Sequence, residues 1–272
     1  MWQCKWGTSD QTISVLGQGT YDMENGDEAT TIASVHRGLE LGLTHIDTAE
    51  AYGSGACERF LAKALEGKRE QAFVVSKVHP KNATYEGTLE ACERSLQRLK
   101  TDYLDGYLLH WHEGPPMEET FRAFEKLLED GKIRTWGVSN FEVHELKHAI
   151  SLVGEGKIAC NQIEYFISQR ANEAELMPYC REHDVTIVAH SPFGDKRFPA
   201  PDSEGGQLLA QIGEAHGASA RATAIAYLLR TRDVCTIPKA GKIPHLEDNA
   251  RGLEITLTAE QIADIERVFP RS

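Results

Sequence analysis

The chain has 272 residues, of which 41% are hydrophobic and 26% charged, a composition typical of a globular protein with a sizeable core and not of a disordered one. Its 41 acidic residues outnumber the 29 basic ones and give a net charge of −12, which disfavours sequence-independent binding to nucleic acid phosphates. No apolar run approaches the roughly 18 residues of a membrane span, and the first residues lack the pattern of a secretion signal, so we expect a cytoplasmic protein that binds neither nucleic acid nor membrane.

The cysteines are scattered along the chain and never form a Cys-x-x-Cys pair. They are Cys4, Cys57, Cys92, Cys160, Cys180 and Cys235. This spacing suggests neither a zinc site nor a disulfide framework, and it fits a reducing compartment.

Apolar, strand-like runs alternate with helical patterns along almost the whole sequence. After an opening segment that we expect to form a short hairpin, strands are predicted at 13–20, 43–47, 72–76, 103–109, 133–138, 158–160, 185–189 and 234–237. Helices are predicted at 28–41, 57–65, 85–99, 117–130, 142–152, 173–181, 208–215 and 220–229, with two more after residue 243. Such alternation indicates an α/β fold with a parallel sheet, and eight repeats predict a single-domain (β/α)8 TIM barrel over residues 1–272.

Polar residues follow the predicted strands where each one ends. They are Asp47, Lys77, His110, Ser139, Asn140, Asn161, Gln162, His190, Ser191 and Lys239. The active sites of (β/α)8 barrels lie at the carboxyl ends of the strands, so these side chains are expected to meet at one mouth.

Tyr52 follows Asp47 by five residues, just before glycines that let the chain turn. A phenol has a pKa of about 10 and donates its proton poorly at neutral pH, unless a nearby cation stabilises the phenolate. Lys77 is the candidate cation, and Asp47 is the carboxylate that a buried lysine requires. Each residue alone also fits an ordinary role: Asp47 as a turn cap, Tyr52 as a core aromatic, Lys77 as a strand end reaching water and His110 as a histidine bound by backbone. Their expected convergence favours a catalytic group.

Seven motifs in order, beginning with His-Ile-Asp-Thr-Ala-Glu-Ala-Tyr-Gly at 45–53, resemble those of aldo-keto reductases. The others lie at 76–78, 108–111, 137–141, 161–162, 191–194 and 237–240. The short form of the chain and the run 108–111 are most similar to bacterial enzymes of the methylglyoxal-reductase kind.

The resemblance implies NAD(P)H-dependent reduction of aldehydes or ketones to alcohols, without a metal. In this scheme Tyr52 gives a proton to the carbonyl oxygen while hydride reaches the carbonyl carbon. Lys77 stabilises the phenolate, Asp47 keeps Lys77 charged and borders the cofactor, and His110 donates a hydrogen bond to the carbonyl.

The resemblance also implies a cofactor groove. Ser139, Asn140 and Gln162 would hold the nicotinamide carboxamide, and Gly19, Thr20, Ser191, Phe193 and Gly194 would line the groove. His190 would lie against the nicotinamide ring, where the family usually has a tyrosine. A side chain that titrates near neutral pH would thus replace a phenol. The stretch 196–206 is interpreted either as a lid across the diphosphate or as a mobile loop.

At the far end of this groove, the resemblance places Lys239, Ala240, Lys242, His245 and Asn249. Pro244 suits the first turn of a helix, and free N–H groups there together with Lys242 would form a site for an adenosine 2′-phosphate. We therefore expect NADPH as the cofactor, with NADH as the alternative, and Asn249 facing the adenine. His245 stands where the family often has an arginine.

The substrate side is expected to be open and lined by Tyr21, Tyr52, His110, Trp111 and His79. Larger family members close the pocket with a long C-terminal loop, whereas here little follows the last predicted helix. An open mouth predicts broad specificity for small, activated carbonyl compounds such as methylglyoxal. We expect a monomer or a weak homo-oligomer.

Two other functions remain open at this point. His110 and His112 form a His-x-His that, with His45 and His190, would suit a metal-dependent barrel hydrolase, although this motif ends the fourth strand and not the first. The other alternative is a regulatory barrel that binds the cofactor and turns over slowly, against which the four intact catalytic positions argue.

Overall fold

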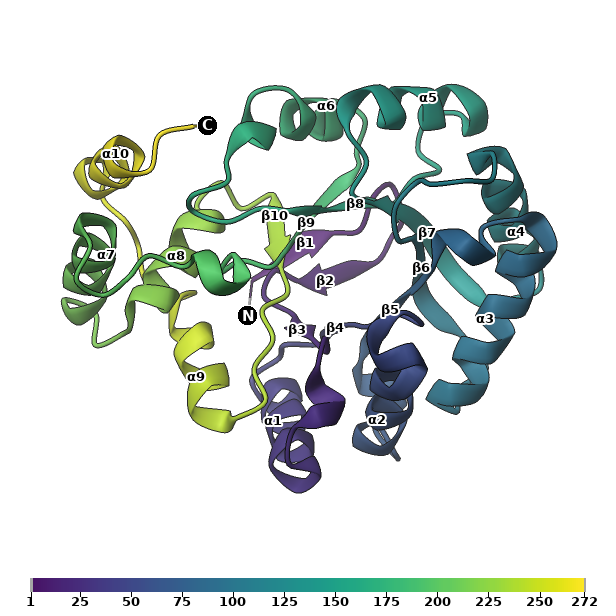
Figure 1. Ribbon diagram of the computed structural model, residues 1–272, viewed down its shortest axis with the longest axis horizontal. Helices are drawn as coiled ribbons and strands as arrows, with labels where there is room; N and C mark the ends of the chain where they lie inside the picture. Colours follow the sequence, from purple (N-terminus) through teal and green to yellow (C-terminus); the bar gives the residue numbers. More distant parts are fainter. Residues whose placement is uncertain (1, 272) are drawn as a thin grey trace.

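The structure, a computed structural model, describes residues 2–271 and contains one eight-stranded parallel sheet surrounded by helices (Figure 1). The strands are β3 (Gln18–Gly19), β4 (His45–Asp47), β5 (Phe73–Val78), β6 (Leu104–Leu109), β7 (Ile133–Ser139), β8 (Cys160–Glu164), β9 (Thr186–His190) and β10 (Val234–Thr236). The helices are α1 (Glu28–Glu40), α2 (Ala56–Ala64), α3 (Tyr85–Leu99), α4 (Met117–Glu129), α5 (Val143–Val153), α6 (Leu176–Glu182), α7 (Glu204–Glu214), α8 (Ala220–Leu228), α9 (Ile243–Arg251) and α10 (Ala259–Val268). No helix within residues 2–271 is long and apolar enough to span a bilayer.

The sheet closes on itself between its first and last strands. The backbone N–H of Gly17 donates to the carbonyl of Thr236 at 2.8 Å, and that of Gly19 donates to the carbonyl of Pro238 at 3.2 Å. A Cβ on Gly19 would lie 2.5 Å from the carbonyl oxygen of Ile237, so a side chain there would push the two edges apart. The predicted (β/α)8 barrel is confirmed.

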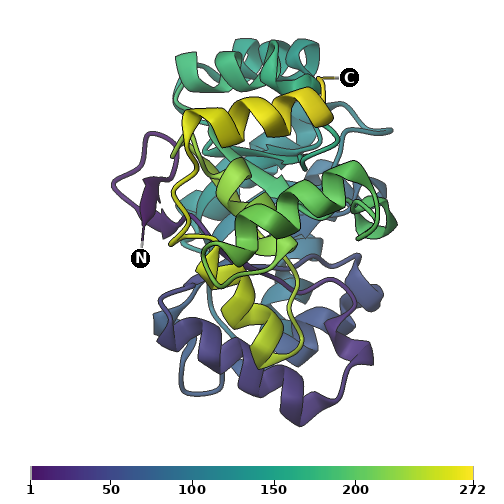
Figure 2. The ribbon, with the colours of Figure 1, turned by 90° about the vertical axis from the view of Figure 1, so that its left-hand side faces the viewer.

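An antiparallel hairpin of β1 (Gln3–Lys5) and β2 (Thr12–Ser14) covers the amino-terminal end of the barrel (Figure 2). Its Trp6 is fully buried and packs edge to face against His45 and Phe73, at the starts of β4 and β5. The hairpin was predicted, but the single strand predicted at 13–20 is wrong. The apolar run spans two strands because its first residues pair with β1 and only its last ones join the barrel.

Three other predicted elements have a boundary that differs from the structure by three residues or more. The strand predicted at 158–160 is β8, which runs on through Asn161 and Gln162 because both are buried and hydrogen-bonded. The helix predicted at 173–181 is a short 3-10 turn, Ala171–Glu173, followed by α6. Helix α7 begins at Glu204 and not at 208, because the Ser203 side chain caps it by accepting from the N–H of Gly206.

A disulfide joins Cys4 of the hairpin to Cys235 of β10, which overturns the expectation that the cysteines form no bridge. These residues are 231 positions apart, so only the closed barrel brings them together. The other four cysteines are free and buried.

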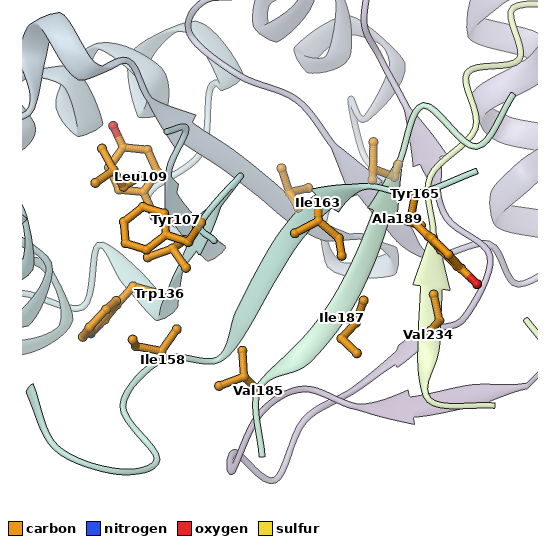
Figure 3. Packing of buried hydrophobic residues seen from close by; sticks show 14 of the residues in the cluster. Tyr107, Leu109, Trp136, Ile158, Ile163, Tyr165, Val185, Ile187, Ala189 and Val234 are labelled. Carbon is orange, nitrogen blue, oxygen red and sulfur yellow. The ribbon is translucent and has the colours of Figure 1, made fainter. Parts of the chain in front are cut away.

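Side chains along each strand point alternately outwards and inwards, which separates two apolar layers. The same alternation decides which polar residues at the strand ends point into the barrel. Val74, Leu109 and Ile187 face outwards and belong to the layer between sheet and helices, part of which is drawn in Figure 3. Val75 and Leu108 face inwards and pack with the hairpin. Because side chains repeat their direction every two residues, the residues two positions beyond Val75 and Leu108 also point into the barrel, at its mouth.

Buried charges anchor the last described residues of the chain to the barrel. The Arg170 guanidinium, only 1% exposed, donates to the carbonyl of Phe269 at 2.7 Å and binds the Glu173 carboxylate. Glu173 also accepts from Tyr165 at 2.6 Å and from Arg230 at 2.9 Å. Burial acts to raise the pKa of Glu173, but these hydrogen bonds outweigh it and lower the pKa to about 2.

We predict that Glu173→Gln lowers the free energy of unfolding at pH 7 by about 2 kcal/mol, the order of one or two charge-assisted hydrogen bonds. A carboxylate whose folded pKa is depressed stabilises the fold above its unfolded pKa of about 4.3 and loses that effect as pH falls towards the folded value. The difference between variant and wild type, measured by urea unfolding, should therefore shrink between pH 4.5 and pH 2. Glu204→Gln, which removes an exposed ion pair with Arg267, is the control and should change little. A constant difference across that pH range would contradict the prediction.

Candidate active site

Lys77 lies at the centre of a buried polar group at the barrel mouth. Its ammonium donates to Asp47 Oδ1 at 2.5 Å, to the backbone carbonyl of Thr48 at 2.9 Å and to the hydroxyl of Tyr52 at 3.1 Å. An ammonium has three N–H donors, so all three are used and the side chain has no freedom to turn. The Lys77 side chain is fully buried.

The turn after β4 brings Tyr52 over Lys77. Gly53, Ser54 and Gly55 all have left-handed backbone angles, with φ of 53°, 51° and 82°. The positive φ of Gly53 favours glycine, and a Cβ there would also lie 2.2 Å from the Glu24 carboxylate, which would have to move. This tight turn reverses the chain and leaves the Tyr52 ring centroid 4.8 Å from Lys77 Nζ.

The charges in this group oppose the effect of burial. Burial raises the pKa of Tyr52, and the neighbouring Lys77 ammonium acts to lower it. Burial disfavours a charged Lys77, but the Asp47 carboxylate outweighs that and raises the pKa of Lys77, so the amine stays protonated. A permanent cation therefore sits beside the Tyr52 hydroxyl.

Polar side chains from β7, β8 and β9 continue the group around the mouth. Gln162 donates its amide to Asp47 Oδ2 at 2.7 Å, and Ser139 donates its hydroxyl to the backbone carbonyl of Gln162 at 2.9 Å. Asn140 donates to the carbonyl of His110 at 3.0 Å, which leaves Asn140 Oδ1 to accept from His190 Nε2 at 2.8 Å. These bonds link three neighbouring strands.

His190 is neutral in this setting. Since its Nε2 donates to Asn140, its Nδ1 accepts from the Ser191 hydroxyl, 3.1 Å away. Burial, together with the charge of Lys77, lowers the pKa of His190 to about 4. The histidine therefore presents an uncharged ring at the mouth throughout the neutral pH range.

Five rings form a continuous row across the mouth. Tyr21 meets Tyr52 with centroids 5.2 Å apart, and Tyr52 meets His110 at 5.7 Å. Trp111 then contacts both His110, at 4.8 Å, and His79, at 4.9 Å. Burial and the charge of Lys77 lower the pKa of His110 to about 2, so this imidazole is neutral and has one N–H to donate.

Two clefts open beside this group. The first, of about 380 Å³, is lined by Gly19, Thr20, Tyr21, Asp47, Tyr52, His190, Ser191, Pro192, Phe193, Asp195, Arg221, Ile237 and Lys239. The second, of about 320 Å³, is lined by Asp22, Met23, Gly26, Asp27, Thr30, Thr31, Lys239, Ala240, Gly241, Lys242 and His245. Both clefts are lined by Lys239, so they adjoin at this residue.

Most of the residues expected to bind cofactor lie on these clefts or support them. Ser139, Asn140 and Gln162 lie behind the first cleft and position Asp47 and His190. Gly194, with φ of 62°, turns the loop after β9. Asn249 is buried in α9 and lines neither cleft.

The stretch 196–206 begins as a tethered turn. Arg197 forms an ion pair with Glu164 and its guanidinium lies 4.6 Å from the Phe166 ring centroid. The last residues of the stretch, 204–206, form the first turn of α7. The stretch is therefore held to the barrel at both ends.

Four charged residues on the clefts were not predicted from the sequence, among them Asp27, the N-cap residue of α1. Asp22 follows β3 and pairs with Lys239 at 3.3 Å, Asp195 lies after β9, and Arg221 lies in the first turn of α8. No local pattern marks these positions, because the side chains come from loops and from a helix far apart in sequence.

The ligand set of a metal-dependent hydrolase is not assembled. His45 faces the opposite end of the barrel, packed between Trp6 and Phe73, and does not meet His110. Within residues 2–271 no three metal-binding side chains come together.

We predict that Asp47→Leu lowers the free energy of unfolding by about 3–5 kcal/mol, because it leaves the ammonium of Lys77 buried without a counter-charge. The double variant Asp47→Leu, Lys77→Met should be less destabilised than the single variant, since it removes both charges. Denaturant unfolding of the two variants and of Asp195→Leu, a control at the exposed rim, measures this. A double variant that is less stable than the single one would show that the pair contributes more than mutual neutralisation.

Comparisons with known proteins agree with this geometry. Residues 15–269 match the model of the Aldo/keto reductase family. The chain is 39% identical to methylglyoxal reductase YeaE of Escherichia coli, over 97% of this chain and 93% of that protein. It is 37% identical to glyoxal reductase of Bacillus subtilis, over 92% and 87%. The crystal structure of an aldo-keto reductase from Klebsiella pneumoniae in complex with NADPH superposes with a TM-score of 0.93 at 34% identity, covering 100% of this chain and 96% of that one. This chain, with its barrel and its buried lysine at the mouth, belongs to the aldo/keto reductase family.

Proposed function

We propose that this protein reduces small, activated aldehydes and ketones to alcohols with NADPH as hydride donor, and that 2-oxoaldehydes of the methylglyoxal type are among its substrates. The observation that carries the proposal is the contact of the Lys77 ammonium with both Asp47 and the hydroxyl of Tyr52 beside an open cleft. The names of the bacterial relatives, methylglyoxal reductase and glyoxal reductase, support the choice of substrate class.

The two clefts fit an elongated dinucleotide. They adjoin at Lys239, and the hydroxyl of Thr20, which lines the first cleft, is buried without a hydrogen-bond partner among residues 2–271. Buried polar groups are normally satisfied, so an orphan hydroxyl in a cleft marks a position for a ligand atom. The complex of the Klebsiella pneumoniae protein with NADPH supports this choice of cofactor.

Bound NADPH would supply a hydride to the carbonyl carbon. Tyr52 donates its phenolic proton to the carbonyl oxygen as negative charge develops there, and it regains a proton from solvent. Lys77 stabilises the phenolate left behind, and Asp47, held by Gln162, keeps the ammonium in place. The neutral His110 offers one N–H to the same oxygen and thereby orients the carbonyl.

The ring row favours small substrates over bulky ones. Tyr21 is 65% exposed at one end of the row, and none of the residues described after α10 lines either cleft. Few walls mean few contacts that differ between substrates in the transition state, so discrimination among small carbonyls should be weak.

We predict that Tyr52→Phe lowers the turnover of methylglyoxal by about 100-fold or more while NADPH still binds, because only the proton donor is lost. Turnover is measured as NADPH consumption with a panel of small aldehydes, ketones and sugars, and NADPH binding by fluorescence. Tyr21→Phe, which changes the ring that packs against Tyr52, is the control and should keep most of the activity. Near-wild-type turnover by Tyr52→Phe would remove this residue from the mechanism. Wild-type protein that binds NADPH but reduces nothing in the panel would favour a regulatory barrel.

The second cleft is where we place the adenosine 2′-phosphate. Lys242 precedes α9 as its N-cap residue, Pro244 occupies its first turn, and His245 lines the same cleft. The first N–H groups of a helix lack intrahelical partners and attract anions. Lys242 therefore adds a positive charge to a helix end that already favours anion binding. Asp22 and Asp27 also line this cleft and oppose an anion, which makes the lysine more important.

We predict that NADPH binds more tightly than NADH and that Lys242→Ala narrows the gap by about 3- to 10-fold, the order expected for one exposed charge-assisted contact. Dissociation constants of both cofactors for the wild type and the variant measure the gap. Lys147→Ala, an exposed lysine on α5, is the matched control. Equal affinities of the unmutated protein for the two cofactors would contradict the placement.

A further inference from the structure

Arg221 lines the first cleft but takes no part in the buried group around Lys77. Its guanidinium carbon lies 4.9 Å from the ring centroid of Phe198 and 5.5 Å from that of Phe193. The two rings meet edge to face, with centroids 5.7 Å apart. Guanidinium groups pack favourably on aromatic faces, and this packing orients the side chain while leaving its N–H groups free.

Charge in the first cleft is unevenly matched. The charged side chains that line it are Asp47, Asp195, Arg221 and Lys239. Asp47 is neutralised by Lys77, and Lys239 is paired with Asp22 at 3.3 Å. Arg221 forms no ion pair or side-chain hydrogen bond with any residue between 2 and 271. It is therefore the cation on this cleft whose donors remain available to a ligand.

The start of α8 itself offers no competing anion site. The Ser219 hydroxyl accepts from the N–H groups of Arg221, at 3.1 Å, and Ala222, at 3.3 Å. Asp248 in turn binds Ser219. Because these two backbone donors are already used, the guanidinium is the main anion-binding group at this position.

We propose that Arg221 binds the diphosphate of the dinucleotide, an inference that rests on the proposed function and extends it. We place the nicotinamide end beside Tyr52 and the adenosine end beside Lys242, so the middle of the ligand would run along the first cleft, which Arg221 lines, towards Lys239, where the two clefts adjoin. A guanidinium offers two parallel N–H groups to phosphate oxygens, a geometry that a lysine cannot provide. It also offsets the repulsion between the diphosphate and Asp195.

The test compares ligands that do and do not carry the diphosphate. Arg221→Met keeps an unbranched apolar side chain against Phe193 and Phe198 but removes the charge. Dissociation constants are measured by calorimetry for NADPH, for 2′-phospho-ADP-ribose, which lacks the nicotinamide, and for adenosine 2′-monophosphate, which lacks the diphosphate. We expect about a tenfold weaker affinity for the first two ligands, as for one charge-assisted contact, and less than a twofold change for the third.

Two further variants distinguish a direct contact of Arg221 with the ligand from an effect of the protein's net charge. Arg122→Met removes an exposed arginine that packs 4.9 Å from the Tyr85 ring centroid on the outside of the barrel, and it should bind all three ligands like the wild type. Arg221→Lys keeps the charge without the paired donors and should fall between wild type and Arg221→Met. The affinity of Arg221→Met for NADPH should also depend less steeply on salt concentration, because one charge contact is missing.

Three results would overturn the inference. Unchanged affinity of Arg221→Met for NADPH would show that the guanidinium does not contact the ligand, and equal losses for all three ligands would show a general disturbance of the site. Equal losses in Arg221→Met and Arg122→Met would assign the effect to net charge. Wild-type protein that fails to bind NADPH at all would instead overturn the proposed function, and the inference with it.

Discussion

The active end of this barrel depends on one buried ammonium with three fixed acceptors. Lys77 is fully buried and can remain charged only because Asp47 lies 2.5 Å away. The hydrogen bonds to Asp47 and to the backbone carbonyl of Thr48 also fix the direction of the ammonium, so its third donor points to the Tyr52 hydroxyl. A structural requirement, the neutralisation of a buried charge, and a chemical one, a cation beside a phenol, are thus met by the same contacts.

The closed barrel supplies the rigidity that this arrangement needs. Hairpin β1–β2 covers the amino-terminal end, and Trp6 packs on β4 and β5, the two strands that carry Asp47 and Lys77. The mouth is left to polar residues, and these form a chain of hydrogen bonds from Asp47 through Gln162 and on across β7 and β9. Strand packing at one end therefore holds the polar group at the other.

The groove formed by the two clefts has a different origin. Its charged side chains come from loops after β3, β9 and β10 and from the start of α8, and they are only partly matched: Asp22 pairs with Lys239, while Arg221 has no partner within residues 2–271. Arg221 on the first cleft and Lys242 on the second add local positive charge, which favours an anionic ligand in a chain of net charge −12. The neutral state of His190, due to its burial and to Lys77, answers the concern that a histidine in place of the usual tyrosine would titrate near neutral pH.

Periodicity and residue type by themselves determined the barrel and most of its mouth. Alternation of strands and helices is a local property, and Asp47, Lys77 and His110 could be assigned to one rim because each stands at the carboxyl end of a predicted strand. The motifs at 45–53 and 76–78 indicated the family because each is a contiguous run of residues that can be recognised in the sequence.

Only the tertiary structure decided which distant groups meet. The run 13–20 divides between hairpin and barrel because two different partners compete for its backbone, and β8 continues through two polar residues because the buried mouth satisfies their hydrogen bonds. The Cys4–Cys235 bridge, the Asp22–Lys239 pair and the place of Arg221 on the cleft join positions up to 231 residues apart. No local pattern encodes such contacts, since they arise when the barrel closes and brings its first and last strands side by side.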